Sequence, residues 1–155
     1  MRVGIGYDIH RLEEKNDLVL GGVNISYKKG LVGHSDADVL VHSLIDALLG
    51  AVGLGDIGTY FPDTDPRYEN ISSMKLLEKT VDLLQEENYY VNNVDLLIIA
   101  ESPKLSPYRE QMVANIAGVL NVEVSRVNLK ATTAEGLGFV GKEEGIAAKA
   151  IVSVK

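Results

Sequence analysis

Apolar stretches along the chain are short and are separated by polar or glycine-rich segments, a spacing that predicts alternating strands and helices. Residues 94–100 form a nearly continuous apolar run, which is typical of a strand buried on both faces of a sheet. Strands are expected at Arg2–Tyr7, Val94–Ala100, Val127–Thr133 and Ile146–Val154, together with a hairpin at Asp17–Tyr27.

Three helices are expected between these strands, each preceded by a residue type that caps helix N-termini. A segment rich in Gly, Asp and Pro, 55–69, follows the first helix and is typical of a mobile loop. The order of elements predicts one α+β domain over residues 1–155, with helices packed on one face of a mixed sheet. The helices should run from Ser35 or Asp36 to about Val52, from Ser72 or Ser73 to near Glu87, and from Ser106 to near Leu120.

Composition narrows the possible functions. The 155 residues carry a formal net charge of -7 and no basic cluster, which argues against binding to nucleic acid or an anionic membrane. The longest apolar stretch, 39–54, is interrupted by His42, Ser43 and Asp46, so a buried helix is expected rather than a membrane span. Without cysteine, disulfides and thiol catalysis are excluded, and without an apolar leader the protein is expected to be cytoplasmic.

Three residues are candidates for a metal site. Asp8 and His10 are two positions apart in an expected strand, so their side chains should project from the same face. His42 lies in the first helix, in line with Asp38 and Asp46, either of which could orient its imidazole. One carboxylate and two imidazoles form a catalytic zinc set with an open position. The alternatives are a Tyr-Asp turn with a surface histidine for Asp8 and His10, and a solvated helix edge or a satisfied core histidine for His42.

Two further segments suit phosphate. His34 and Ser35 lie at the expected start of the first helix, whose N-terminal N–H groups favour anions, although simple helix capping by Ser35 or Asp36 would explain the pattern too. Thr132, Thr133 and Glu135 end a strand before a glycine, and their oxygens suit a phosphate with a hard cation such as Mg²⁺. Threonines at a strand end also occur for β-propensity alone.

Two matches to the dinucleotide-binding pattern G-x-G-x-x-G do not support cofactor binding. The match at 53–58 follows a helix instead of a strand. The match at 136–141 follows a strand, but too few residues remain after it to complete a dinucleotide-binding unit. Nicotinamide and flavin cofactors are therefore not expected.

The motifs taken together resemble the 2-C-methyl-D-erythritol 2,4-cyclodiphosphate synthase family over essentially the full chain. The resemblance implies a lyase of the non-mevalonate isoprenoid pathway, which converts 4-diphosphocytidyl-2-C-methyl-D-erythritol 2-phosphate into the cyclic diphosphate and CMP. The matching segments are Gly6-Tyr7-Asp8-Ile9-His10-Arg11, His34-Ser35-Asp36-Ala37-Asp38-Val39, His42, Gly55-Asp56-Ile57-Gly58, Phe61-Pro62-Asp63-Thr64-Asp65 and Thr132-Thr133-Ala134-Glu135-Gly136.

The resemblance also implies a role for each matching residue. Asp8, His10 and His42 would bind Zn²⁺, and Glu135 a second ion, Mg²⁺ or Mn²⁺. His34 and Thr133 would stabilise the transition state. The remaining substrate contacts would come from Ser35, from Asp56, Ile57, Gly58, Phe61, Asp63 and Asp65 at the methylerythritol end, and from Ala100, Pro103, Lys104, Leu105, Ser106, Ala131 and Thr132 around the cytidine.

Family members assemble as homotrimers with active sites between subunits, so the resemblance implies the same assembly here. Phe139 and Lys142 would line the central channel, where many members have Arg in place of Lys142, and Lys lacks the planar fork of Arg. Two alternatives remain open from the residues alone: a zinc-dependent phosphohydrolase, in which water replaces the internal phosphate, and a trimeric nucleotide-binding protein without turnover.

Overall fold

A computed structural model describes all residues, 1–155, and its centre is a five-stranded mixed sheet. The strand order is β4-β1-β7-β5-β6, and β5 and β6 form the one parallel pair. The strands β2 and β3 form a separate hairpin, as the sequence predicts. The strands are β1 (Arg2–Glu14), β2 (Leu18–Leu20), β3 (Val23–Ile25), β4 (Lys29–Leu31), β5 (Val91–Ile99), β6 (Val127–Thr132) and β7 (Gly145–Val154).

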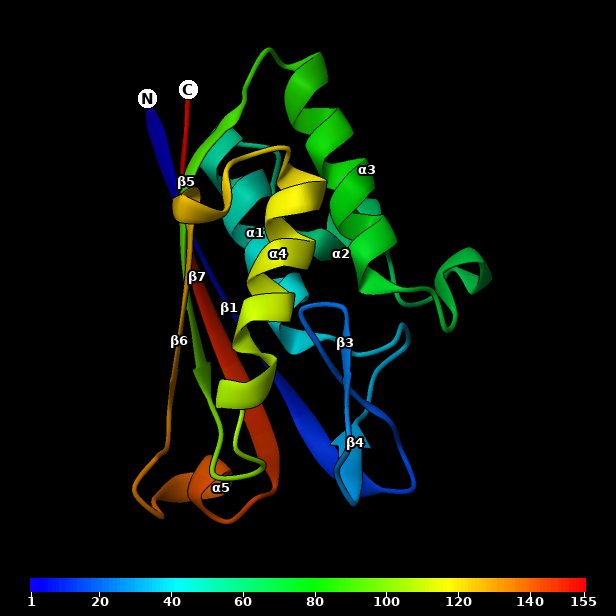
Figure 1. The fold of residues 1–155 in the computed structure, drawn as a ribbon. Coiled ribbons are helices and arrows are strands. Elements are labelled where there is room, and N and C mark those ends of the chain that lie inside the picture. The colour runs from blue at the N-terminus through cyan, green and yellow to red at the C-terminus, as the bar shows by residue number, and fades with distance from the viewer.

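The long helices lie on one face of the sheet, which confirms the expected α+β arrangement (Figure 1). α1 packs on β1 and β7, α4 packs beside β6, and α3 packs on the outer side of both helices. A cluster of 38 buried residues fills the space between these elements. The helices are α1 (Val39–Val52), α2 (Ile57–Tyr60), α3 (Ser73–Glu86), α4 (Arg109–Leu120) and α5 (Gly138–Gly141), with 3-10 turns η1 (Pro66–Tyr68), η2 (Ser106–Tyr108) and η3 (Val124–Arg126).

Two glycines let α1 approach β1 closely. A Cβ atom on Gly6 would lie 1.9 Å from the carbonyl oxygen of Ser43, and one on Gly4 would lie 1.9 Å from that of Ala47. The side chain of Ile5, between these two glycines, points to the opposite face of the sheet and is 71% exposed. The sheet therefore has one face covered by helices and one bare face.

The bare face is apolar along β1, whereas Asp95, Lys130 and Lys149 place charged groups on its other strands. Exposed residues on it include Val3, Ile5 and Tyr7 of β1, and Ile151 of β7 stands opposite Ile5 in the strand register. Contiguous exposed apolar side chains of this kind mark an interaction surface. None of the helices has both the length and the apolar character needed to cross a bilayer.

The structure corrects the expected start of the first helix. α1 begins at Val39, and its N-cap is Asp38 instead of Ser35 or Asp36. Asp38 is fully buried, and its carboxylate accepts hydrogen bonds from the backbone N–H groups of Val41 and Gly22. The carboxylate thus joins the helix end to the β2–β3 turn, a long-range contact that the local sequence does not reveal.

Other segments also differ from expectation, including β5, which starts at Val91 instead of Val94. β1 runs seven residues beyond Tyr7, to Glu14, because it pairs with β7 as far as Arg11 and then with the unpredicted strand β4. The expected loop at 55–69 contains the short helices α2 and η1. Ser106 and Pro107 form a 3-10 turn, so the regular α4 helix starts later. The proline ring and its missing N–H are compatible with such a turn.

Candidate metal centre and active site

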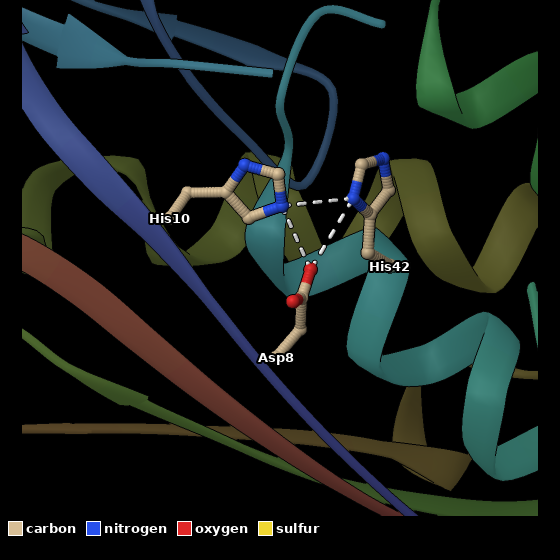
Figure 2. A group of neighbouring side chains, drawn as sticks. All are labelled: Asp8, His10 and His42. Atoms are coloured by element: carbon tan, nitrogen blue, oxygen red, sulfur yellow. Dashed lines mark hydrogen bonds and ion pairs between the residues drawn. The ribbon is translucent and has the colours of Figure 1, made fainter. Parts of the chain in front are cut away.

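Asp8, His10 and His42 converge at the junction of β1 and α1 (Figure 2). Asp8 and His10 point to the same side of β1, as their two-residue spacing predicts. The distance from His10 Nε2 to Asp8 Oδ2 is 2.8 Å, from His10 Nε2 to His42 Nδ1 3.1 Å, and from His42 Nδ1 to Asp8 Oδ2 3.3 Å. These three atoms could hold one metal ion.

The geometry of the cluster fits a tetrahedral zinc site. Ligand atoms about 2.0 Å from a tetrahedral metal lie roughly 3.3 Å from one another, close to the 2.8–3.3 Å separations observed. The donor set contains nitrogen and oxygen, which Zn²⁺ accepts, and three protein ligands leave a fourth position free. The cluster is only partly buried, so this position can be reached from outside.

Both imidazole rings are held through the nitrogen that faces away from the cluster. His10 Nδ1 donates to the carbonyl oxygen of Val32 over 2.8 Å, which leaves Nε2 directed at Asp8. His42 Nε2 lies 2.9 Å from Ser73 Oγ and 3.0 Å from Ser35 Oγ. Hydrogen bonds of this type orient histidine ligands in metal sites.

The expected role of Asp38 or Asp46 in orienting His42 is wrong. Asp38 has the non-helical φ and ψ of an N-cap residue, so the helical i, i+4 relation does not carry its side chain to His42. The Asp46 carboxylate accepts a hydrogen bond from the backbone N–H of Ile57 over 2.8 Å and thereby anchors the start of α2. The hydroxyls of Ser35 and Ser73 occupy the orienting position instead.

The electrostatics of the cluster favour an ionised Asp8 beside a protonated His10. Burial disfavours the ionised form of Asp8, but hydrogen bonds and the charges of His10 and His42 outweigh it and hold the pKa of Asp8 far below its usual range. Burial likewise disfavours protonated His10, yet the hydrogen bond and the charge of Asp8 raise the pKa of His10. Protons on these groups would compete with a metal ion.

The cluster forms part of the wall of a cavity of about 430 Å³. This volume lies in the range typical of small-molecule sites. His34 and Ser35 lie on the wall beside the metal cluster, and His34 Nε2 donates to the carbonyl oxygen of Asp65 over 3.1 Å. Of the residues expected at the methylerythritol end, the cavity is lined by Ile57, Gly58, Phe61 and Asp63.

Asp56 and Asp65 belong to the same segment but shape it instead of lining the cavity. Asp56 is the N-cap of α2, and its carboxylate accepts hydrogen bonds from the backbone N–H and the hydroxyl of Thr59. The Asp65 carboxylate accepts hydrogen bonds from the Arg67 guanidinium, which holds the pKa of Asp65 at about 2. The rings of Phe61 and Tyr68 pack edge to face, which ties the middle of the segment to its end.

Thr133 and Glu135 lie at a different place in the chain. They follow β6, which is separated from β1 by β5 and β7, and neither residue lines the cavity at the metal cluster. Thr133 Oγ1 donates to Glu135 Oε1 over 3.2 Å, and Glu135 has a positive φ of 52°. One chain therefore does not bring the two expected metal sites together.

The residues expected around cytidine are divided among several surfaces. Leu105, Ser106 and Ala131 line a second cavity of about 350 Å³, beside Arg109. Ala100, Pro103, Lys104 and Thr132 lie on neighbouring segments and do not line it. Phe139 lines a smaller hollow of about 200 Å³ with His10 and Glu144, and Lys142 lies outside that hollow.

Sequence reasoning missed one group at the centre. Ser73 was expected only as a possible helix cap, although it is fully buried and contacts His42. Asp36 accepts hydrogen bonds from both the backbone N–H and the hydroxyl of Ser73. No local pattern links residues this far apart in the sequence, because the contact depends on how α3 packs against α1.

Known proteins match this chain along nearly its whole length. The model of the YgbB family matches residues 1–155. A 2-C-methyl-D-erythritol 2,4-cyclodiphosphate synthase from Alkaliphilus metalliredigens is 61% identical over 154 residues, which cover 99% of this chain and 97% of the relative. A relative of the same name from Agathobacter rectalis is 58% identical and is covered to 87%.

Solved structures resemble the fold equally well. A 2C-methyl-D-erythritol-2,4-cyclodiphosphate synthase in a CDP-bound form aligns with a TM-score of 0.92 at 37% identity, covering 99% of this chain and 100% of that chain. The bifunctional IspDF from Campylobacter jejuni aligns with a TM-score of 0.95 at 46% identity, and this chain spans 42% of that longer one.

Proposed function

Since the chain belongs to the YgbB family, we propose that it is a 2-C-methyl-D-erythritol 2,4-cyclodiphosphate synthase. It converts 4-diphosphocytidyl-2-C-methyl-D-erythritol 2-phosphate into the cyclic diphosphate, with CMP as the leaving group. The observation that carries this proposal is the Asp8–His10–His42 cluster, which stands in the wall of a cavity that also contains His34 and Ser35. Neither alternative explains the full-length identity to synthases as well.

The cluster would hold Zn²⁺, which fits its nitrogen and oxygen donors and its separations. When bound, the ion supplies a Lewis acid for a phosphate oxygen. The nucleophile is a phosphate that is already ionised at neutral pH, so the chain needs no strong general base for the attack. Its residues chiefly hold two crowded phosphates at the correct distance and orientation.

Each cavity residue has a task in this reaction. The Nε2–H group of His34 donates to the Asp65 carbonyl oxygen, which holds the ring on the cavity wall beside the proposed phosphate position. Ser35 lines the same wall and would contact the erythritol-side phosphate. Ile57, Gly58 and Phe61 enclose the methylerythritol end and exclude water from the reacting phosphates. His34 and Thr133 stabilise the transition state in this proposal.

The complete site would form between subunits of a homotrimer. Two features support this assembly: the exposed apolar residues of β1 on the bare face of the sheet, and the separation of Thr133 and Glu135 from Asp8 within one chain. In the trimer one subunit supplies the zinc ligands. Its neighbour would supply Lys104 and the surrounding cytidine contacts, and Glu135 would hold Mg²⁺ or Mn²⁺, which would neutralise phosphate charge. The CDP-bound relative supports a cytidine nucleotide as ligand.

Product analysis tests the proposal. The purified protein, incubated with the substrate, Zn²⁺ and Mg²⁺, should release CMP and the cyclic diphosphate in equal amounts, as followed by ³¹P NMR. The Ser43→Ala variant should give the same products, because the buried Ser43 hydroxyl donates to a carbonyl oxygen within α1 and does not line the cavity. CMP with only linear phosphate products would instead identify a phosphohydrolase, and binding of CDP without turnover would identify a binding protein.

A further inference from the structure

Ser73 occupies an unusual position for a serine in the first turn of a helix. A serine at this position usually bonds to solvent or to its own helix backbone. The Ser73 hydroxyl is fully buried and contacts neither of them. Instead it lies between the Asp36 carboxylate and the Nε2 atom of His42, 2.9 Å from the latter. The chain Asp36–Ser73–His42 therefore runs from the start of α3 to the metal cluster.

The direction of hydrogen bonding along this chain follows from the donors available. A carboxylate accepts only, so the single hydrogen of the Ser73 hydroxyl must go to Asp36. Ser73 Oγ can then only accept from His42, which requires the hydrogen of the imidazole to be on Nε2. The Nδ1 atom of His42 is left with a free lone pair that points at Asp8 and His10.

Two neighbours cannot fix this tautomer by themselves. Ser35 Oγ lies 3.0 Å from His42 Nε2, but its hydroxyl can act as donor or acceptor there. Asp8 Oδ2 lies 3.3 Å from His42 Nδ1 and, without a metal, attracts the hydrogen to Nδ1. Ser73 opposes this attraction because Asp36 prevents its hydroxyl from acting as a donor to His42.

We propose that Ser73 is a positioning residue that, together with Asp36, holds His42 in the Nε2–H tautomer required for metal binding through Nδ1. Because the Ser73 hydrogen goes to Asp36, the hydrogen bond between Ser35 Oγ and Ser73 Oγ, over 3.2 Å, must use the hydrogen of Ser35. The inference rests on the metal centre of the proposed function but not on its substrate. It can therefore be tested by metal binding and by the state of the metal-free ring.

The Ser73→Ala variant removes the hydroxyl selectively. The backbone N–H of residue 73, which donates to Asp36 over 3.0 Å, remains, so the start of α3 keeps its anchor. The matched control is Ser43→Ala, which removes an equally buried hydroxyl beside His42 that donates to the Leu40 carbonyl oxygen. Ser43→Ala loses one buried hydrogen bond and no contact with the imidazole, whereas Ser73→Ala loses the hydroxyl's contacts with Asp36, Ser35 and His42.

Two measurements decide the question. Competition with a chromophoric chelator should show that Ser73→Ala binds Zn²⁺ roughly 10–100-fold more weakly than wild type, while Ser43→Ala binds it unchanged. In the metal-free protein, ¹⁵N NMR of the His42 ring should show the Nε2–H form in wild type and in Ser43→Ala, and a mixture of tautomers in Ser73→Ala.

Several results would overturn the inference. These are wild-type affinity in Ser73→Ala, an equal loss in Ser43→Ala, or a wild-type ring with its hydrogen on Nδ1. If the wild-type protein bound no Zn²⁺, the proposed metal centre would fail, but the NMR comparison would still decide the tautomer question.

Discussion

The close approach of β1 and α1 offers a sharp test of how the fold builds the metal centre. In a Gly6→Ala variant the new methyl carbon would lie 1.9 Å from the carbonyl oxygen of Ser43. An ordinary non-bonded contact is about 3.5 Å, so α1 must move by roughly 1.5 Å. The obstacle is backbone rather than a flexible side chain, and this shift cannot be avoided by a change of rotamer.

The displacement should affect both stability and metal binding. Overpacking a core costs about 1–3 kcal/mol, and a clash with backbone belongs at the upper end. In a domain of this size 3 kcal/mol corresponds to a loss of roughly 6–12 °C in Tm. His42 is adjacent to Ser43, so its Nδ1 atom moves away from Asp8 Oδ2, while metal–ligand distances tolerate only about 0.2 Å. Zinc affinity should fall by more than about 100-fold.

The matched control is Gly50→Ala, farther along the same helix. A Cβ atom on Gly50 would have no neighbour within 4 Å, so this change should raise stability by about 0.5–1 kcal/mol through helix propensity. It should leave zinc affinity unchanged. Thermal unfolding by circular dichroism and chelator competition measure the two effects. Wild-type Tm and zinc affinity in Gly6→Ala would refute the argument that this glycine permits the cluster to form.

Three other variants test separate parts of the site. His42→Ala should keep the fold and lose zinc binding. In the wild-type protein, zinc at 100 times Kd should add about 2.7 kcal/mol to the free energy of unfolding, which a thermal-shift assay detects. An equal gain in stability in the variant would contradict the assignment of His42 as a ligand. Glu101→Ala should lower kcat about tenfold or more, because Glu101 Oε1 accepts hydrogen bonds from the backbone N–H groups of Ala134 and Gly136 and so shapes the turn that carries Thr133. Hydrogen bonds to a charged group contribute about 1.5–3 kcal/mol. Unchanged kinetics would show that this turn does not need Glu101. Ile5→Asp should dissociate the proposed trimer into monomers, because it places a charge among the exposed apolar residues of β1. Light scattering measures the molar mass, and an intact trimer would show that the interface lies elsewhere.

Several features could be predicted from the sequence because they depend on local periodicity. The two-residue repeat of a strand places Asp8 and His10 on the same side, and the structure places them so. The capping residues and apolar runs gave the order of the long helices and most strands correctly. The motif set also gave the family, which the comparisons confirm.

Local periodicity failed where a residue left its regular element. Asp38 was expected to lie in line with His42 on the helix, but as an N-cap it has non-helical torsion angles and reaches Gly22 instead. The last part of β1, residues 12–14, is not predicted because its partner β4 has little apolar pattern of its own. In both cases a long-range contact, with no local signature, decided the outcome.

By itself the sequence determined which side chains could act as ligands and the direction in which each leaves its strand or helix. The tertiary structure decided which of them meet. Gly6 lets α1 approach β1 closely enough to join His42 to Asp8 and His10, and the packing of α3 brings Ser73 to the far side of the same ring. The physical reason is that hydrogen-bonded periodicity fixes orientation within an element, whereas the relative placement of elements depends on steric fit between residues distant in sequence.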